Sequence, residues 1–414
     1  MKFRLIAKKI LTLYFVILAK AILARYKPKI VVITGSVGKT STKSALYAVL
    51  RHFVSVRKNE IQGNAWGIAL TIIGGNTETR VGAQVGNIFK SLLVLIFKGD
   101  YPAWLILELA CQKPGDLDEV LPWLAPDVVI ITYFGLTPPH IEFFKSREHL
   151  ISEKLSILSK LKKDGFVIWN IDDPNLNYVK EKIKSPIITF GLKSEANISG
   201  SNIQVVYRED FPDGLNFRIN YGGNSVPIHI SKALGNNHIY AFLAAFAFAS
   251  KQHFNMITAS QAAENYNPPW GRMKLVEGEK GTLIIDDTYN SSPNAVEEAL
   301  NSLSQIKVPG RKIAVLGDML ELGRDTHDAH KQIGELAAKS VDYLITVGFR
   351  AQGFGEGALG FLDSGKIAEF EDIHKAGKFL ENLIKPGDII LIKGSRPLHL
   401  EEIVEEIKAV SRVL

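Results

Sequence analysis

The chain has 414 residues, of which 46% are hydrophobic and 22% charged, and its formal net charge is +6. This composition is typical of folded protein, the length predicts two or more domains, and long disorder is excluded. The single cysteine, Cys111, excludes an internal disulfide framework and a cysteine zinc site, and fits a reducing compartment. The modest positive charge suits small polyanions such as nucleotides, although a generic basic surface explains it equally well. Nucleic acid is not expected, because no basic run is interleaved with aromatic residues.

The first 28 residues are basic and apolar. Their longest uncharged run, residues 10–19, is too short to span a bilayer. A signal peptide is disfavoured because no clear small-residue cleavage site precedes the first predicted strand. Two interpretations of an N-terminal helix remain open. It lies in a membrane interface with its lysines toward anionic lipid, or it docks on the protein's own core.

Short apolar runs and helical segments then alternate, which predicts a mainly parallel sheet with helices on both faces. The predicted strands are residues 30–34, 104–109, 127–132, 166–170 and 186–190, and the clearest helices are 41–50, 146–161 and 241–249. Residues 197–230 differ, because apolar and polar residues alternate there. Turn signals at 212–214 and 222–224 predict small antiparallel hairpins.

A second α/β series follows the segment 267–271 (NPPWG), which is the best linker candidate. Its predicted strands are residues 283–285, 313–316, 344–347 and 389–392, and its helices are 295–303, 327–338 and 401–409. A doubly wound, Rossmann-like domain is expected. The predicted domains are an N-terminal helix (1–28), a central ATP-binding domain (29–266) and a C-terminal domain (267–414).

Residues 34–40 (TGSVGKT) lie between a predicted strand and a predicted helix and match the short GxxGKT form of a phosphate loop. The longer form fails, because Ile33 stands where it needs a glycine. In such loops backbone N–H groups and a helix N-terminus face phosphate oxygens, the lysine bridges the outer phosphates, and the threonine hydroxyl ligates Mg²⁺. The alternative is a glycine turn with a solvated lysine. The predicted nucleotide-binding residues here are Gly35, Ser36, Val37, Gly38, Lys39, Thr40 and Ser41.

Several ordered blocks resemble the Mur ligase superfamily, and the similarity runs from about residue 29 through nearly the whole chain. The blocks are 34–42 (TGSVGKTST), 105–110 (LILELA), 284–293 (IIDDTYNSSP), 315–323 (VLGDMLELG) and 392–396 (IKGSR). They are most similar to the subfamily of UDP-N-acetylmuramoyl-tripeptide–D-alanyl-D-alanine ligases. The resemblance implies a cytoplasmic, ADP-forming carboxylate–amine ligase of cell-wall synthesis that uses ATP and an acyl phosphate.

The resemblance also implies a centre of two Mg²⁺ ions, with the Thr40 hydroxyl on one ion and Glu108 on the second. His140 lies where the family has a metal-ligand histidine. Lys154 follows at the spacing of the lysine that the family carbamylates, which converts an ammonium into an anionic oxygen ligand. Without the resemblance, His140 could cap the following helix and Lys154 could be an exposed lysine. The catalytic residues that the resemblance implies are Lys39, His140, Lys154 and Arg272.

In the C-terminal domain, Arg272 matches the family's linker arginine and would bind ATP phosphates. Asp287, Tyr289 and Asn290 would approach the nucleotide. The alternative for this block is an ordinary strand-to-helix turn, capped by Asn290 or Ser291.

Further residues match substrate-binding positions of the family. Lys393, Ser395 and Arg396 would contact a carboxylate or the incoming dipeptide, although a solvated turn fits nearly as well. Asn64 corresponds to part of the acceptor segment. His330 falls at a family position, and a surface helix histidine explains it equally well.

Two departures leave the acceptor open. About thirty residues precede the phosphate loop, too few for the family's uridine-binding N-terminal domain, and the GxHNxxN block reads GNNH at residues 235–238. Alternative acceptors are a lipid-linked precursor, a pseudomurein-like peptide and folate polyglutamate; a non-catalytic, membrane-associated nucleotide-binding module is the alternative of another class. The expected partners are ATP, a peptide-bearing carboxylate and a dipeptide amine. A monomer at the inner membrane face, with membrane contact through residues 1–28, is expected.

Overall fold

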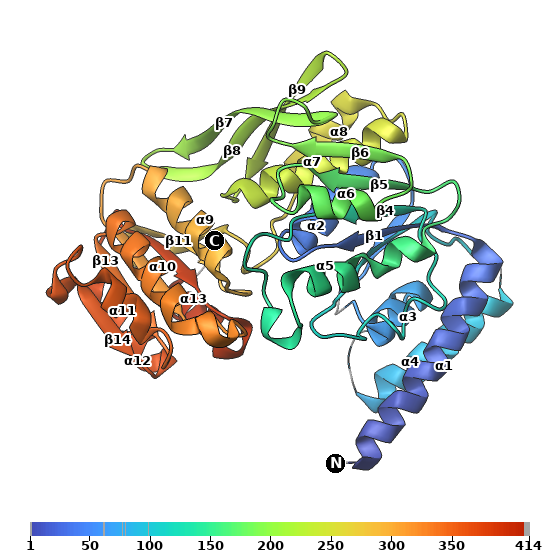
Figure 1. Ribbon diagram of the computed structural model, residues 1–414, viewed down its shortest axis with the longest axis horizontal. Coiled ribbons are helices and arrows are strands. Elements are labelled where there is room, and N and C mark those ends of the chain that lie inside the picture. The colour runs from blue at the N-terminus through green and yellow to red at the C-terminus, as the bar shows by residue number, and fades with distance from the viewer. Residues whose placement is uncertain (1, 61–62, 77, 79, 98, 410–414) are drawn as a thin grey trace, which may run out of the picture. The chain divides into compact units, whose positions relative to one another are not determined.

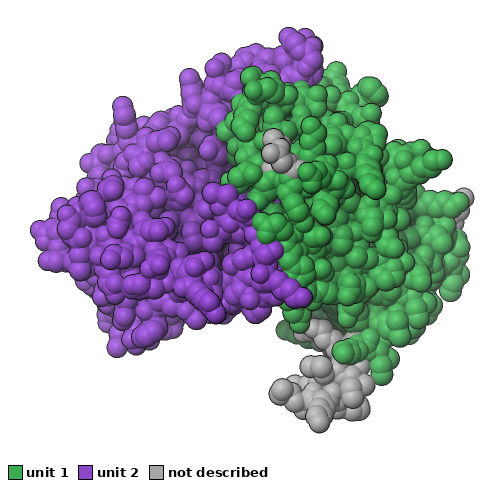
Figure 2. All heavy atoms as spheres, in the orientation of Figure 1, with its two compact units in different colours: residues 1–133, 148–199, 240–262 green, residues 134–147, 200–239, 263–414 purple. Residues whose placement is uncertain are grey.

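Figure 1 shows the computed structural model, which describes residues 2–60, 63–76, 78, 80–97 and 99–409. The chain divides into two compact units (Figure 2): residues 1–133, 148–199 and 240–262 form the first, and residues 134–147, 200–239 and 263–414 the second. Residue 1 and residues 410–414, at the outer ends of the predicted first and last domains, lie outside the described residues. The domain limits after residues 28 and 266 stay a prediction.

A parallel sheet organises the first unit. Its strands are β1 (Lys29–Thr34), β2 (Val56–Lys58), β3 (Trp104–Glu108), β4 (Val128–Ile131), β5 (Phe166–Asn170) and β6 (Ile187–Gly191). They pair in the order β2-β3-β1-β4-β5-β6, all parallel. The central strands β1, β3, β4 and β5 are mostly hydrophobic and buried, because helices cover both faces of such a sheet. The predicted parallel sheet is confirmed.

Helices α1 (Lys2–Tyr26), α2 (Lys39–Leu50), α3 (Ala65–Ile73) and α4 (Val81–Ile96) belong to this unit, as do α6 (Leu176–Lys182) and α8 (Met256–Ala262). Most residues of α5 (Arg147–Leu155) and α7 (Asn236–Lys251) belong to it too. Helix α1 buries one stripe, made by Phe15, Leu18, Ala19 and Ile22. The Phe15 ring meets Trp66 of α3 edge-on, with ring centroids 5.3 Å apart. Docking of α1 on the protein's own core is therefore confirmed for this stripe, and no described helix is long and apolar enough to cross a membrane.

Three long strands follow, β7 (Ile198–Arg208), β8 (Phe211–Tyr221) and β9 (Asn224–Ser231). The β8–β9 hairpin turns at Gly222 and Gly223, whose φ angles are 50° and 79°, as expected from its glycines. The turn expected at 212–214 is wrong, because these residues lie within β8 and the chain turns at Glu209 instead, with φ 55°. Gly214 permits close strand packing, since a Cβ there would lie 2.1 Å from the Ile230 carbonyl oxygen.

The second unit also contains a six-stranded sheet. Its strands are β10 (Lys274–Gly278), β11 (Thr282–Asp287), β12 (Lys312–Gly317), β13 (Tyr343–Val347), β14 (Ile367–Phe370) and β15 (Ile389–Lys393), in the order β10-β11-β15-β12-β13-β14. Only the edge strand β10 is antiparallel to its neighbour. The helices are α9 (Pro293–Gln305), α10 (Thr326–Ser340), α11 (Gln352–Ala358), α12 (Ile373–Leu383) and α13 (Glu401–Ile407). The predicted Rossmann-like α/β fold is confirmed.

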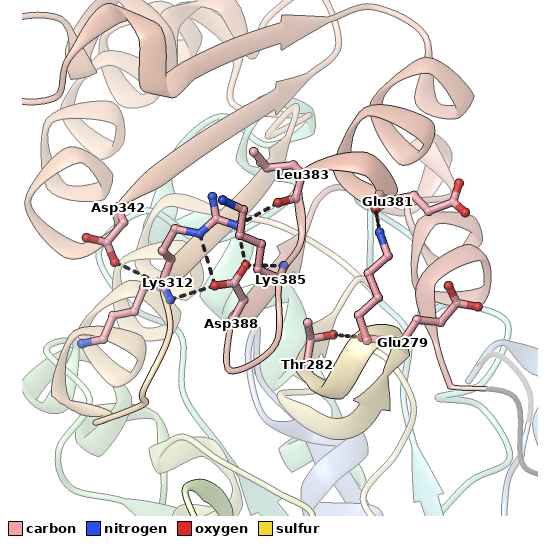
Figure 3. Close-up of polar contacts among 10 residues, drawn as sticks. Glu279, Thr282, Lys312, Asp342, Glu381, Leu383, Lys385 and Asp388 are labelled. Carbon is pink, nitrogen blue, oxygen red and sulfur yellow. Dashed lines mark hydrogen bonds and ion pairs between the residues drawn. The ribbon is translucent and has the colours of Figure 1, made fainter.

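A buried carboxylate ties together the starts of β12 and β15 (Figure 3). Asp388 accepts hydrogen bonds from the Arg311 guanidinium at 2.6 and 3.2 Å, from the Arg311 backbone at 2.8 Å and from Lys385 N at 2.9 Å. Arg311 also donates to the Leu383 carbonyl at 2.8 Å. This network fixes two central strands at the end of the sheet where they begin.

Candidate active site

The phosphate loop joins β1 to α2 and needs its two glycines. Gly35 has φ 134°, and a Cβ there would lie 2.1 Å from the Thr132 hydroxyl oxygen. Gly38 has φ 85° and is the N-cap residue of α2. Ser36 N donates to the Tyr133 carbonyl at 2.8 Å, which holds the loop against the end of β4. The expected strand–loop–helix arrangement is present.

The side chains of this loop offer donors to an anion. Lys39 Nζ donates to the carbonyls of Gly35 and Ser36 at 2.9 and 3.2 Å, so the ammonium folds back over the loop. The Val37 carbonyl accepts from Thr132 Oγ1 at 2.6 Å. The Ser36 hydroxyl is buried and has no hydrogen-bond partner among the described residues. An unpaired buried donor, a glycine cradle and a helix N-terminus together fit a phosphate group.

A hydroxyl and a carboxylate meet beside the loop. Thr40 Oγ1 donates to Glu108 Oε1 at 3.0 Å, and Lys43 Nζ pairs with Glu108 Oε2 at 2.9 Å. The backbone of Glu108 is held by Asn59, whose side chain accepts from Glu108 N at 2.9 Å and donates to its carbonyl at 3.1 Å. Hydroxyl and carboxylate oxygens are the donors that Mg²⁺ prefers, so Thr40 and Glu108 fit that ion. Across the described part of the chain, no three His, Cys, Asp or Glu side chains are grouped so that they could hold a metal.

Sequence reasoning missed Lys43, although its signal is simple. It follows Lys39 by one helical turn in GKTSTK, which places both lysines on the same face of α2. Its side chain is only 7% exposed, and a buried lysine needs an acceptor.

Lys154 lies at the end of α5 and is only 2% exposed, so the exposed-lysine alternative is wrong. Its Nζ donates to the Cys111 carbonyl at 2.7 Å, and its own carbonyl accepts from the Thr34 hydroxyl at 3.0 Å. Thr34 is the last residue of β1, immediately before the phosphate loop. Burial lowers the pKa of the Lys154 ammonium, which favours the neutral, nucleophilic amine.

His140 belongs to the second unit and has φ 70°. It is the N-cap residue of the short 3₁₀ helix Ile141–Phe143, as the helix-cap alternative expected, but its side chain makes no capping hydrogen bond. Nδ1 of its ring contacts the Glu321 carboxylate instead. The ring is thus oriented by an acidic partner, as metal-ligating histidines commonly are.

The linker runs directly against the block at the end of β11. Gly271 has φ 65°, donates from N to Asp286 Oδ2 at 2.8 Å, and accepts from Tyr289 N at 3.2 Å. The Arg272 guanidinium lies 4.1 Å from the centroid of the Tyr289 ring. Its Nε is buried without a hydrogen-bond partner among the described residues. The structure therefore brings two predicted nucleotide residues together, and one retains an unused donor.

A second guanidinium extends this stack. Arg396 lies 4.4 Å from the Trp270 ring centroid and 5.6 Å from that of Tyr289. The Trp270 and Tyr289 centroids are 5.4 Å apart, and Trp270 is 43% exposed. Sequence reasoning treated Trp270 only as linker. Its position between Pro269 and Gly271 gave no signal that it would contact both Tyr289 and Arg396.

The remaining predicted residues of this block bond mainly to the protein itself. Lys393 Nζ pairs with Asp287 Oδ2 at 2.6 Å and donates to the Asn290 carbonyl at 2.9 Å. Burial raises the pKa of Asp287, and the neighbouring Lys393 opposes that shift. Ser395 Oγ accepts from Leu320 N at 2.9 Å. The shape of this block is thus held by bonds within the protein from Lys393, Asp287 and Ser395.

Two polar residues at helix starts were also assigned roles from the sequence. The N-cap residue of α9 is Ser292, and its side chain makes no capping bond, so capping by Asn290 or Ser291 is wrong. Asn64 caps α3, where Oδ1 accepts from Gly67 N at 3.0 Å.

His330 is fully buried in the structure, so the surface-histidine alternative is wrong. One ring nitrogen, Nε2, accepts from Met319 N at 2.9 Å. The other, Nδ1, donates to the Thr326 carbonyl at 2.6 Å. Both ring nitrogens therefore bond to the backbone, and burial lowers the pKa of the ring.

The altered GNNH block produces two contacts that sequence reasoning missed. Asn237 donates from Nδ2 and N to the Glu298 carboxylate of α9 at 2.7 and 3.2 Å. Burial raises the pKa of Glu298 to about 7. His238 bridges the Tyr266 hydroxyl at 2.8 Å and the Arg272 carbonyl at 2.7 Å, and burial lowers its pKa to about 4. The block thus positions the backbone of the linker arginine.

Known proteins resemble the chain along most of its length. A UDP-N-acetylmuramoyl-tripeptide–D-alanyl-D-alanine ligase of Bacillus subtilis is 29% identical over 394 residues, which cover 94% of this chain and 78% of the relative. The ligase of the same name from Escherichia coli is 26% identical over 385 residues, which cover 92% and 77%. The structure of a MurF ligase from Thermotoga maritima in complex with ADP superposes with a TM-score of 0.77 at 25% identity, covering 95% of this chain and 83% of that one.

Two family profiles match in succession. The Mur ligase middle domain matches residues 33–249, and the Mur ligase glutamate ligase domain matches residues 271–396. Because the first profile alone spans more than half of the sequence, the chain belongs to the Mur ligase family.

Proposed function

We propose that this chain is an ATP-dependent, ADP-forming ligase that joins D-alanyl-D-alanine to the carboxylate of a muramoyl-tripeptide precursor. The observation that carries the proposal is the phosphate loop with Lys39 folded over it and the Thr40–Glu108 pair beside it. The names of the Bacillus subtilis and Escherichia coli relatives supply the substrate class. The structure of the Thermotoga maritima relative, which holds ADP, supports nucleotide binding.

The chemistry follows from these donors. Lys39 and the loop N–H groups hold the outer phosphates while the substrate carboxylate attacks the γ-phosphorus, which releases ADP and leaves an acyl phosphate. The dipeptide amine then attacks the acyl carbon, the amide bond forms, and inorganic phosphate leaves with the amine's proton transferred to solvent. Mg²⁺, held by Thr40 and Glu108, would supply charge neutralisation at the phosphates.

Lys154 is proposed to carry a carbamate. Its neutral amine, favoured by burial, attacks CO₂; the N–C bond forms, one proton leaves, and an anionic oxygen donor results. That group, with Glu108 and the family-matched His140, would hold the second Mg²⁺. The short bond from Lys154 Nζ to the Cys111 carbonyl shows that the amine sits where a polar partner is needed.

Residues of the second unit are proposed to bind the nucleotide and the amine. Arg272 has an unused buried donor for a phosphate, and Tyr289 and Asn290 offer a ring face and an amide to the nucleoside. Arg396, held against Trp270, is the proposed contact for the dipeptide carboxylate. Asp287, Lys393 and Ser395 position these groups, and Asn64 is proposed near the acceptor. In this proposal the functional domains are residues 29–266 and 267–414.

Membrane contact through residues 1–28, a monomeric state and a location at the inner face of the membrane are part of the same proposal. The support lies in α1, whose side opposite Phe15 exposes Ile10, Leu13 and Ile17.

Replacing Lys39 tests the proposal directly. Lys39→Ala removes the ammonium above the loop, and acceptor-dependent ADP release should fall roughly a thousandfold. Lys378→Ala, an exposed lysine of α12, is the control and should keep full activity. The assay uses UDP-linked muramoyl-tripeptide with D-alanyl-D-alanine and follows ADP and the amide product. Undiminished ligation by Lys39→Ala would refute the proposed site.

A further inference from the structure

Helix α4 has its amphipathic faces inverted. The side chains that it buries are polar: Gln84, Asn87 and Ser91 are 7%, 2% and 0% exposed. Apart from Lys90, the large side chains that it exposes are apolar: Val85, Phe89, Leu92, Leu93, Ile96 and the following Phe97. Phe89 is 64% and Ile96 67% exposed. A helix of a water-soluble surface shows the opposite pattern, so the outer face of α4 is not built for water.

The buried polar face is satisfied locally, so the inversion is a stable arrangement. Asn87 accepts from Asn76 N at 2.6 Å and donates to the Asn76 carbonyl at 2.8 Å. Gln84 donates to the Glu78 carbonyl, and Ser91 donates to the Ile88 carbonyl at 2.6 Å. The bonds of Gln84 and Asn87 reach residues outside α4 and therefore limit the rotation of the helix about its axis, which holds the apolar residues outward.

Helix α1 continues the same apolar face. The two helices pack together, and Tyr26 at the end of α1 donates to the carbonyls of Val94 and Phe97 at 2.8 and 3.1 Å (Figure 1). The exposed stripe of α1 repeats at helical spacing through Ile10, Leu13 and Ile17. We call the exposed residues of α1 and α4 the α1–α4 surface.

The charge of this surface has one sign. Residues 2–27 and 80–99 contain no Asp or Glu. Exposed basic side chains surround the apolar ones: Lys9, Lys20, Arg25, Lys27 and Lys90. An apolar face with basic residues and without acidic ones is complementary to anionic lipid, whose acyl chains accept the apolar side chains and whose phosphates accept the lysines.

We propose that the α1–α4 surface docks this protein on an anionic lipid bilayer, with Phe89, Leu93 and Ile96 of α4 inserted among the acyl chains. The proposal extends the membrane contact of residues 1–28 to a second helix and is independent of the ligase chemistry. A second copy of the chain is a poorer occupant, because pairing two such faces brings lysines together without any carboxylate on either helix.

The test measures sedimentation of the full-length protein with vesicles of phosphatidylcholine containing phosphatidylglycerol, and with pure phosphatidylcholine vesicles. The wild-type chain should partition onto the anionic vesicles, and added salt should release part of it. Phe89→Gln/Ile96→Gln should weaken the partition coefficient roughly tenfold or more. Phe349→Gln/Ile257→Gln is the matched control, because it removes the same residue types at 75% and 62% exposure elsewhere, and it should bind as the wild type does.

Two results would overturn the proposal. One is a wild-type chain that stays in the supernatant with anionic vesicles. The other is equal binding by Phe89→Gln/Ile96→Gln and its control. Analytical ultracentrifugation could give a third such result. If the wild-type chain formed a dimer, did not bind vesicles, and became monomeric in Phe89→Gln/Ile96→Gln, the surface would be assigned to self-association. All four positions are exposed, so thermal unfolding should confirm that both variants fold. Ligation of soluble substrates should persist in both, so a failed ligase assay with intact vesicle binding would reject only the proposed reaction.

Discussion

The carboxylate of Glu108, at the end of β3, is the acidic group beside the phosphate loop in the first unit. Glu108 is almost enclosed, with 17% of its side chain exposed, and Lys43 pairs with it from α2. Separating a buried pair of this kind leaves one charge without compensation, which destabilises a fold by about 3–5 kcal/mol. Lys43 therefore holds the Glu108 carboxylate in place next to Thr40, where a metal ion could replace the lysine as its partner.

Lys154 gives a prediction at the same scale. Lys154→Ala removes the proposed carbamate, and ligation should fall roughly 100-fold. Because burial lowers the pKa of the amine, carbamylation should already occur at neutral pH, so CO₂-depleted wild-type protein should regain activity when bicarbonate is added. A small carboxylate such as formate should partly restore the Ala variant. Steady-state rates decide: an unchanged rate in Lys154→Ala removes this residue from the reaction, and Lys160→Ala, at an exposed position of the same segment, is the control.

Glu298 predicts a pH dependence of stability. Its pKa rises from 4.5 to about 7 in the folded chain because of burial first and the neighbouring Asp287 second. The folded state therefore holds the proton more tightly than the unfolded state does. The favourable contribution is complete below pH 4.5 and is lost as the pH rises through about 7.

Between pH 5 and pH 8 the wild-type chain should accordingly lose on the order of 2 kcal/mol of unfolding free energy from this group. Glu298→Gln imitates the protonated acid and should remove that loss, so it should be more stable than the wild type at pH 8. Urea unfolding at both pH values measures the difference. Equal pH slopes in the two proteins would contradict the assignment.

The sequence alone identified some site residues and missed others whose contacting partners are distant along the chain. Glu108 and Lys154 were identified through the resemblance to a known family, because it preserves spacing along the chain. Spacing carries no information about burial, so the Lys154–Cys111 contact and the lowered pKa needed the fold. Glu298 was missed because its partner Asn237 is 61 residues away along the chain, and only the folded chain brings the two side chains together.

At the scale of elements, the hydrophobic pattern of the sequence predicted the buried central strands but not the strands at the edges of the second unit's sheet. The central strands of both sheets are short runs of mainly buried hydrophobic residues and were predicted within one or two residues. The edge strands β10 (KLVEG) and β14 (IAEF) are short and half-polar, and neither was predicted. The prediction of a turn near residue 212 was wrong. Proline and glycine usually mark turns, but here Pro212 lies near the start of β8 and Gly214 allows close contact with the neighbouring strand.

The Asp388 network gives an element-scale prediction. Burial alone would raise the pKa of Asp388, but the hydrogen bonds from Arg311 and the backbone outweigh it, so the pKa is lowered. The stabilisation is therefore present above the unfolded pKa and is lost as the pH falls through the folded one. Asp388→Asn should reduce the unfolding free energy by about 1–3 kcal/mol at pH 7 and by less at pH 3.

Denaturant unfolding at the two pH values checks this. Asp164→Asn, at an exposed turn, is the control and should change stability by no more than about 0.5 kcal/mol. If Asp388→Asn lost the same unfolding free energy at pH 3 and at pH 7, the negative charge of Asp388 would not be the source of the stabilisation between β12 and β15.

At the scale of the whole molecule, two compact units predict unfolding in more than one step. The tryptophans distinguish the steps. Of the five in the chain, Trp66, Trp104, Trp123 and Trp169 lie in the first unit and only Trp270 in the second. Intrinsic fluorescence therefore reports mainly on the unit that carries the phosphate loop.

ATP with Mg²⁺ should raise the midpoint of that fluorescence transition. A ligand present at about 100 times its dissociation constant stabilises the unit that binds it by about 2.7 kcal/mol, equivalent to a shift of roughly 5–10 °C for a unit of this size. Lys39→Ala should abolish the shift, because it removes the ammonium that crosses the loop, while Lys378→Ala should keep it. An equal shift in Lys39→Ala would place the nucleotide away from the loop. A shift that EDTA leaves unchanged would instead separate nucleotide binding from the Thr40–Glu108 metal site, since that pair contributes only when a cation bridges it to phosphate.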